Sequence, residues 1–255
     1  MRSWTPWRRR QALRSAAAID PAGESDKLPG VDVTFEAILF DAGGVLVLPD
    51  PDVLGPLLAY YGGDPSHETH HRAHYHAMAV KSAAGAGETF WQEYDAAYVR
   101  RVGVPGSAAD AAAAALGGTR NAFVWRSPIP QSVAALWELH RRETPIGVVS
   151  NASGHIQDIL RRSGVCQVGA GPHVPVRCLV DSHVVGVAKP DPRIFDFALA
   201  HFDGIRRDRV AYVGDSVTMD VGGARAAGIY PILLDPHDDH TNADFARIRS
   251  LRELL

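Results

Sequence analysis

Short runs of hydrophobic residues recur along the chain from residue 35 onward, and each is too short to form a helix. Those rich in β-branched or aromatic residues predict β-strands at residues 36–40, 146–150, 209–214 and 231–234. Between them, hydrophobic residues spaced to share one helical face predict helices over residues 130–143, 153–164 and 191–202. Ser153 is placed to cap the second helix and Gly164 to end it. Strands that alternate with helices of this length indicate a doubly wound parallel α/β sheet.

A long segment between the first two predicted strands does not share this alternation. It reads as helical stretches separated by glycine- and proline-containing turns, and its alanine run at residues 111–115 favours helix. We therefore predict a small all-helical domain over residues 49–127, inserted into an α/β core that comprises residues 34–48 and 128–255.

The first 33 residues differ from the rest of the chain. A basic, tryptophan-containing start is followed by a small, polar stretch that is broken by proline and glycine. A secretory signal peptide needs a hydrophobic stretch of roughly 7–15 residues, and none follows the basic start. We predict a flexible N-terminal extension over residues 1–33.

The composition excludes several classes of protein. A formal net charge of −3 gives no electrostatic basis for binding nucleic acid or an anionic membrane. No hydrophobic run approaches the ~18 residues of a membrane span. The two cysteines, Cys166 and Cys178, cannot build a disulfide framework, so we expect a reducing, cytoplasmic location. Neither a nucleic acid nor a membrane is expected as a partner, and the oligomeric state is not specified.

Polar side chains follow three of the predicted strands, at the point where each strand ends. They are Asp41, Ser150 with Asn151, and Asp215, and a second carboxylate follows at Asp220. Any one of them alone could be a helix N-cap. Because ligands of doubly wound sheets bind outside the carboxyl ends of the strands, the set predicts a functional site at this edge.

The sequences around these residues resemble the four motifs of the haloacid dehalogenase superfamily of hydrolases. In chain order the motifs are LFDAGGVL at residues 39–46, VVSNAS at 148–153, GVAKPDPRIF at 186–195 and VGDSVTMD at 213–220. Their order and spacing fit the family from residue 36 to about residue 235. The predicted insertion lies where the family carries a helical cap domain, so the resemblance implies a Rossmann-like core with a cap over residues 49–127.

The resemblance implies a phosphatase that works through an aspartyl-phosphate. Asp41 would be the nucleophile, and the Ser150 hydroxyl and the backbone amide of Asn151 would donate to the phosphoryl oxygens. Lys189, one of three lysines in an arginine-rich chain, would neutralise charge between nucleophile and phosphate. The substrate would be a small soluble phosphoester.

The resemblance also implies a Mg²⁺ cofactor. Its ligands would be Asp41, the backbone carbonyl of Gly43, Asp215 and Asp220. A divalent cation held by hard oxygen donors would offset the repulsion between an attacking carboxylate and a phosphate dianion.

Gly43 departs from the family pattern. Phosphatases of the family usually carry a second aspartate there, which protonates the leaving oxygen, and such acid–base help is worth ~10²–10⁴ in rate. Three interpretations follow: a leaving group that departs unaided, a proton donor elsewhere in the chain, or a catalytically weak member that serves as a binding or regulatory protein. Glycines at this turn would also allow a positive φ.

Other hydrolases of the superfamily lack this aspartate too. Dehalogenases typically lack the intact fourth motif that is present here at residues 213–220. Phosphonate hydrolases need a cap lysine that forms a Schiff base, and Lys81 is the single lysine of the predicted cap. A phosphonate substrate therefore stays open as an alternative.

A histidine-rich stretch of the predicted cap has two further interpretations. The stretch 67–71, HETHH, matches a zinc protease signature, but five histidines within residues 67–76 make a chance match easy. One of these histidines could instead supply the proton missing at Gly43. A solvated or partly buried cap helix is the simpler interpretation.

Two other patterns carry less weight. The VGDS at residues 213–216 is similar to the serine block of GDS-type esterases, but no Asp-x-x-His follows it. In the cap, Trp91, Tyr94 and Tyr98 have helical spacing. They could line a pocket, but we expect them to pack in the cap core.

Overall fold

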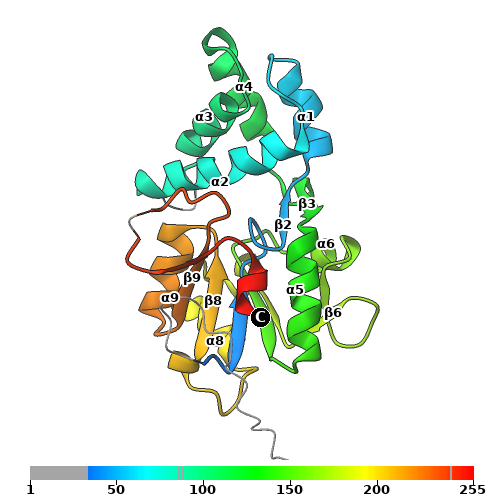
Figure 1. The fold of residues 1–255 in the computed structure, drawn as a ribbon, viewed down its shortest axis with the longest axis vertical. Coiled ribbons are helices and arrows are strands. Elements are labelled where there is room, and N and C mark those ends of the chain that lie inside the picture. The colour runs from blue at the N-terminus through cyan, green and yellow to red at the C-terminus, as the bar shows by residue number, and fades with distance from the viewer. Residues whose placement is uncertain (1–33, 86, 88, 242) are drawn as a thin grey trace, which may run out of the picture.

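A computed structural model describes residues 34–255 except residues 86, 88 and 242. The predicted N-terminal extension, residues 1–33, lies outside the described residues. Figure 1 shows a lower α/β body and, above it, a group of helices joined to the body by two strands. None of the helices in the described part of the chain combines the length and hydrophobicity that crossing a bilayer requires.

Six strands form the central sheet, in the order β10-β9-β8-β1-β4-β7, and every neighbouring pair is parallel. Their bounds are β1 Ala37–Phe40, β4 Ile146–Ser150, β7 Leu179–Asp181, β8 Val210–Gly214, β9 Tyr230–Leu234 and β10 Ala246–Ile248. Strand β1 lies between β4 and β8, so the connections diverge from it to both sides. This is the switch point at which doubly wound sheets bind ligands.

Alternate residues of β1 face two separate hydrophobic clusters, as the twofold period of a strand requires. Ile38 and Phe40 pack into one cluster with residues of α5 and α6, and Leu39 packs into the other with residues of α8 and α9. The helices of the body are α5 Pro130–Arg141, α6 Ile156–Arg162, α7 Ser182–Val185, α8 Arg193–Leu199 and α9 Gly222–Ala226. Because the sheet is buried on both sides, its strands are continuously hydrophobic, which is why the sequence revealed them.

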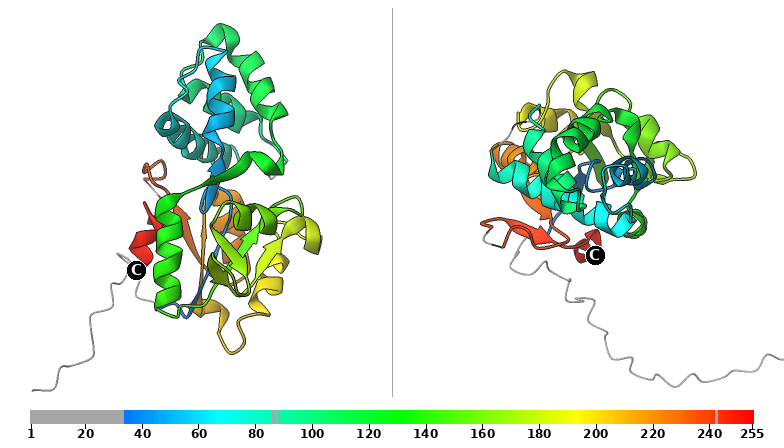
Figure 2. Two further views of the ribbon diagram at one scale, coloured as in Figure 1. Left: turned by 90° about the vertical axis from the view of Figure 1, so that its right-hand side faces the viewer. Right: turned by 90° about the horizontal axis from the view of Figure 1, so that it is seen from above.

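The helices above the sheet have a hydrophobic core of their own. They are α1 Pro51–Ala59, α2 His67–Ala83, α3 Gln92–Arg101 and α4 Ala109–Gly118. Leu54, Leu58 and Tyr98 are among the side chains buried between them. Figure 2 shows this cap from the side, above the body.

The two ends of the insertion pair with each other as antiparallel strands. They are β2 (Val47–Pro49) and β3 (Trp125–Pro128). Short 3₁₀ turns η1 (Gly106–Ala108) and η2 (Ala122–Val124) connect the last cap helix to its neighbours. The pairing of β2 with β3 was not predicted. It brings residues from both ends of the insertion next to the site.

The predicted fold class is confirmed: a doubly wound parallel sheet carries a helical cap. The four predicted strands correspond to β1, β4, β8 and β9, whereas β7, β10 and the separate pair β5 (Cys166–Val168) and β6 (Val174–Val176) were missed. These four are only three residues long, too short for a periodic pattern. The Ser153 cap was wrong, since α6 begins after His155 and no side chain caps it. The domain boundaries remain a prediction.

The tight packing of β4 against its neighbours is testable at Gly147. A Cβ atom there would lie 2.9 Å from Cys178 Sγ, 2.9 Å from Leu39 Cδ2 and 3.1 Å from Phe202 Cζ. Gly147→Ala should therefore destabilise the fold by about 1–3 kcal/mol in urea unfolding, as overpacking does. The control is Gly118→Ala in α4, where nothing lies within 4 Å. It should change stability by less than about 1 kcal/mol. Equal effects of the two substitutions would contradict the packing described.

Candidate active site

The end of β1 turns sharply so that Asp41 is held at the edge of the sheet. The Asp41 N–H donates to the Val213 carbonyl at 2.8 Å, and its carboxylate accepts from the Ala42 N–H at 2.7 Å. Gly44 makes the turn with φ +70°, and a Cβ there would overlap the Asp215 carboxylate. A positive φ at this turn was predicted, and the structure places it at Gly44, not at Gly43.

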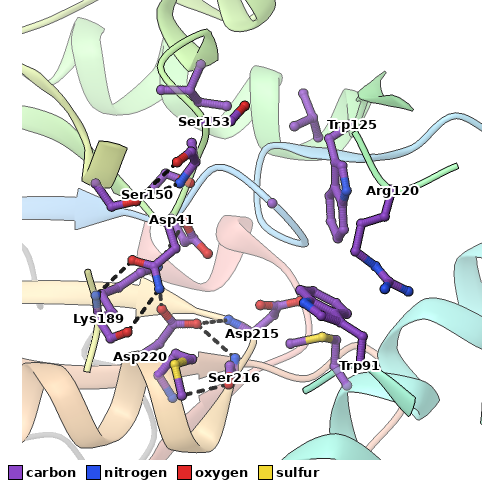
Figure 3. Close-up of a pocket in the computed structure, with 18 of the residues that line it drawn as sticks. Asp41, Trp91, Arg120, Trp125, Ser150, Ser153, Lys189, Asp215, Ser216 and Asp220 are labelled. Atoms are coloured by element: carbon purple, nitrogen blue, oxygen red, sulfur yellow. Dashed lines mark hydrogen bonds and ion pairs between the residues drawn. The ribbon is translucent and has the colours of Figure 1, made fainter. Parts of the chain in front are cut away.

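Lys189 is the buried cation of the site. Its Nζ lies 3.1 Å from Asp41 Oδ1 and 2.7 Å from Asp220 Oδ1 (Figure 3). It also donates a hydrogen bond to the Tyr212 hydroxyl at 2.8 Å. The hydroxyl of Tyr212 donates in turn to the Val149 carbonyl at 2.9 Å. The structure thus brings together three of the predicted residues, and Tyr212 is a member that the sequence did not indicate.

Burial and charge act on these groups in opposite directions. Burial raises the pKa of Asp41 to about 7, with the charges of Asp220 and Asp215 adding to the rise and Lys189 opposing it. Burial alone would lower the pKa of Lys189, but the charges of Asp220 and Asp41 outweigh it and raise that pKa above its usual range. The lysine therefore stays charged. The positive charge around Asp41 is too small for its carboxyl group to be fully ionised at neutral pH.

Asp215 follows β8, and Asp220 lies in the π-helical turn η4 (Val217–Val221). Asp220 Oδ2 accepts hydrogen bonds from the backbone N–H groups of Asp215 and Ser216 at 3.0 and 2.9 Å. Oxygen atoms of Asp41, Asp215 and Asp220 lie within 4.8 Å of one another, and all three residues are buried. A group of hard oxygen donors this close together fits a cation such as Mg²⁺.

Ser150 ends β4, and a hydrogen bond from its side chain lowers the pKa of Asp41, against the larger effect of burial. The Asn151 side chain has a role that the sequence did not indicate. It accepts from the Lys189 N–H at 2.8 Å and donates to the Lys189 carbonyl at 3.0 Å. These paired hydrogen bonds hold the backbone of Lys189 and thereby aim its ammonium group at Asp41.

A cavity of about 340 Å³ opens above these groups, between body and cap. The body contributes the charged residues described above, together with Gly43, Ser150 and Asn151. The cap and its connections contribute Met78, Lys81, Trp91, Arg120, Asn121 and Trp125. Figure 3 shows Trp125, Arg120 and Trp91 across the cavity from Asp41 and Ser150. Trp91 lines the cavity and also packs, partly buried, against the cap core, and Tyr94 and Tyr98 are buried in that core.

Trp125 explains why glycine stands at position 43. A Cβ on Gly43 would lie 3.1 Å from Cζ3 and 3.2 Å from Cε3 of the Trp125 indole. A side chain at this position would therefore crowd the indole, which would have to shift by a few tenths of an ångström to admit it. The sequence showed the missing carboxylate but not the ring, because Trp125 comes from the opposite end of the insertion.

His74 is the cap histidine that reaches the acidic cluster. It is buried, with Nε2 3.0 Å from Asp215 Oδ2 and Nδ1 2.9 Å from the Tyr94 hydroxyl. Both ring nitrogens are therefore engaged. His74 orients Asp215 and does not face the cavity.

The other histidines of α2 have different neighbours: His67 contacts Asp52, His70 contacts Tyr98, His71 contacts His237, and His76 lies near Asp239. Among the described residues that line the cavity around Asp41, none is a histidine. In the same part of the chain, the single group of three or more potential ligands close enough to share one ion is the aspartate cluster. The structure therefore supports neither the zinc protease interpretation nor a histidine proton donor.

The raised pKa of Asp41 predicts how stability depends on pH without metal. The unfolded chain ionises Asp41 near the ordinary value of 3.8, but the folded protein resists ionisation up to about pH 7. The free energy of unfolding that is lost because Asp41 ionises less readily in the folded protein therefore grows from about pH 4 to about pH 7, and it is constant above pH 7. In chelator, Asp41→Asn should raise the melting temperature relative to wild type, and by more at pH 8 than at pH 5. Asp244→Asn, on the surface, should show no such trend. An Asp41→Asn effect that does not increase with pH would disprove the assignment.

Comparison with known proteins agrees with this geometry. The phosphoserine phosphatase of Thermus thermophilus is 35% identical over 130 residues, 49% of this chain and 49% of that protein. The pyrimidine 5'-nucleotidase YjjG of Escherichia coli is 34% identical over 112 residues, 44% of this chain and 46% of that protein. The glyceraldehyde 3-phosphate phosphatase of Methanopyrus kandleri is 28% identical over 166 residues, 62% and 67% of the two chains. The first two matches span about half the length of each relative.

Solved structures share the fold at low sequence identity. The HAD phosphatase from Thermococcus onnurineus superposes with a TM-score of 0.52 at 18% identity, covering 86% of this chain and 95% of that one. A HAD-superfamily hydrolase from Ehrlichia chaffeensis has a TM-score of 0.54 at 15% identity, covering 88% and 96%. A family model of haloacid dehalogenase-like hydrolases matches residues 35–228. The chain belongs to the haloacid dehalogenase-like hydrolases, as its four motifs predicted.

Proposed function

We propose that this protein is a Mg²⁺-dependent phosphatase that uses Asp41 as its nucleophile. The observation that carries the proposal is the position of Asp41 at the switch point of the sheet. It faces a cavity, with a buried ammonium group 3.1 Å away and two further carboxylates beside it. A phosphate dianion can be attacked by a carboxylate only where positive charge offsets their repulsion.

Several residues around Asp41 are proposed to bind the metal ion. Asp41, Asp215 and Asp220, with the carbonyl of Gly43, are the proposed Mg²⁺ ligands. Asp220 also accepts hydrogen bonds from the backbone of Asp215 and Ser216. When bound, the ion supplies positive charge that orients a phosphoryl group and keeps Asp41 ionised.

The remaining groups would hold the phosphate itself. Lys189 would contact its oxygens from the side of Asp41, and the Ser150 hydroxyl and Asn151 N–H would donate to them. An oxygen of Asp41 then attacks phosphorus in line with the leaving group, and water hydrolyses the aspartyl-phosphate.

The names of the relatives support a small phosphorylated substrate. Among them are a phosphoserine phosphatase, a pyrimidine 5'-nucleotidase and a glyceraldehyde 3-phosphate phosphatase. Their substrates share little beyond the phosphate group, which agrees with a phosphate-binding site in the body and a variable cap over residues 49–127. A cytoplasmic location is proposed because Cys166 and Cys178 are free and buried.

A phosphonate hydrolase is the second candidate. It is favoured by Lys81, the lysine of the cap, which lines the same cavity as Asp41. A Schiff base between Lys81 and a carbonyl-bearing phosphonate would be trapped by borohydride as a stable adduct, detectable by mass spectrometry. Lys81→Met should abolish the adduct. No adduct, together with turnover of phosphate esters, would eliminate this candidate.

The proposed phosphatase activity is tested by phosphate release from a panel of phosphomonoesters and acyl phosphates. Release should require Mg²⁺ and stop in chelator, because Lys189 alone does not offset the combined negative charge of Asp41, Asp215 and Asp220. Asp41→Asn should lose at least a factor on the order of 10³, as removal of a nucleophile does. The matched control is Asp244→Asn, which should retain wild-type turnover. Release that is unaffected by chelator or by Asp41→Asn would overturn the proposal, and no release across the panel would favour a binding role.

A further inference from the structure

The wall of the cavity that faces Asp41 is aromatic and cationic. Trp91, Trp125, Lys81 and Arg120 form it. Among the described residues that line the cavity, every carboxylate belongs to the cluster around Lys189, and neither histidine nor glutamate is present. An oxygen that leaves phosphorus toward this wall therefore meets no carboxylic acid or imidazole that could protonate it.

Within this wall, the ring of Trp125 lies next to Gly43 of the body. A Cβ atom on Gly43 would lie only 3.1 Å from the indole ring of Trp125. The ring is itself held edge-on by His74 and Trp91, with centroid separations of 5.5 and 6.5 Å. A side chain introduced at position 43 would therefore crowd an indole that has aromatic neighbours on two sides.

The two cations of the wall are better suited to offset charge than to donate protons. The Nζ of Lys81 lies 3.5 Å from the centroid of the Trp91 ring, and Arg120 lies over the same ring with its Cζ at 4.6 Å. Contact with an indole face stabilises the ammonium form of a lysine, and arginine does not lose its proton in proteins. Arg120 also pairs with Asp95, which fixes its position.

We propose that the preferred substrates are aryl or acyl phosphates, whose leaving group departs unprotonated as a planar, delocalised oxyanion beside Trp125. This inference rests on the phosphatase activity proposed above. Delocalisation of its charge makes such an oxyanion a good leaving group that departs without an acid. It also makes the oxyanion flat, so that it can stack on an indole. Lys81 and Arg120 would offset its negative charge.

The steps balance without a general acid. An Asp41 oxygen forms a bond to phosphorus while the bond from phosphorus to the leaving oxygen breaks, and that oxygen keeps the electron pair. Water then forms a bond to phosphorus, and the bond to Asp41 breaks to regenerate its carboxylate. Overall, a phosphate dianion and water give the leaving oxyanion and dihydrogen phosphate.

The test compares leaving groups of matched size with Mg²⁺ present. Phenyl phosphates with electron-withdrawing substituents, and acetyl phosphate, are measured beside cyclohexyl phosphate. We expect kcat/KM to fall steeply as the pKa of the leaving group rises. The aryl and acyl substrates should exceed the cyclohexyl ester by more than the ~10²–10⁴ that a general acid would supply.

A double-mutant cycle tests whether Gly43 and Trp125 cause the steep dependence on leaving-group pKa. Gly43→Asp with Trp125→Ala makes room for a carboxyl and should raise cyclohexyl phosphate turnover relative to phenyl phosphate by ~10² or more. Gly43→Asp alone should not, because the ring still occupies the space, and Trp125→Ala alone should keep the steep dependence. Thermal unfolding confirms that each variant is folded. The dependence of wild-type kcat/KM on the pKa of the leaving group tests the inference without any variant.

Two outcomes would overturn the inference. A flat dependence on leaving-group pKa, with turnover that still requires Mg²⁺ and Asp41, would leave the phosphatase proposal intact but show that another group donates the proton. If Lys81→Met then made the dependence steep, Lys81 would be that donor. Absence of Asp41-dependent release from every substrate would instead refute the phosphatase proposal itself.

Discussion

A single buried ammonium group holds the site together. Lys189 contacts Asp41 and Asp220, and both contacts are shielded from water. Three carboxylates share this one cation, so the fully ionised cluster carries two uncompensated negative charges. A buried charge without a partner is expensive, and the deficit equals the charge of one divalent cation. Burial and the neighbouring carboxylates raise the pKa of Asp41, and the proposed Mg²⁺ would lower that pKa by supplying positive charge.

The cap completes the site by contacting the same loops that carry the acids. Within α2, His74 reaches Asp215, Tyr75 donates a hydrogen bond to the Gly44 carbonyl at 2.7 Å, and Ser82 accepts one from the backbone of η4. Tyr75 and Ser82 are seven residues apart and therefore lie on one side of α2, and His74 adjoins Tyr75. Through these contacts the cap packs directly against the segments that carry Gly44, Asp215 and Val217.

The residues that line the cavity come from two parts of the protein, the body and the cap. The floor of the cavity comes from the ends of parallel strands and the loops beyond them, which supply carboxylate oxygens, the Ser150 hydroxyl and the Lys189 ammonium group. Its opposite wall comes from the cap, where Trp125 takes the space beside Gly43 that a side chain would otherwise fill. A wall of this kind can change without disturbing the floor. This division agrees with relatives whose names give different phosphorylated substrates.

The sequence by itself determined the sheet, the family and the charged floor of the site. Strands buried on both faces are continuous hydrophobic runs, and Asp41, Ser150 and Asp215 follow them directly, so local pattern was enough. The three-residue strands β7 and β10 escaped because no period can be read from so few residues. Only the tertiary structure decided which of five similar histidines reaches Asp215 and what occupies the space beside Gly43. Those outcomes depend on the rotation of α2 against the sheet and on the pairing of β2 with β3, and both arise from packing between segments far apart in the chain.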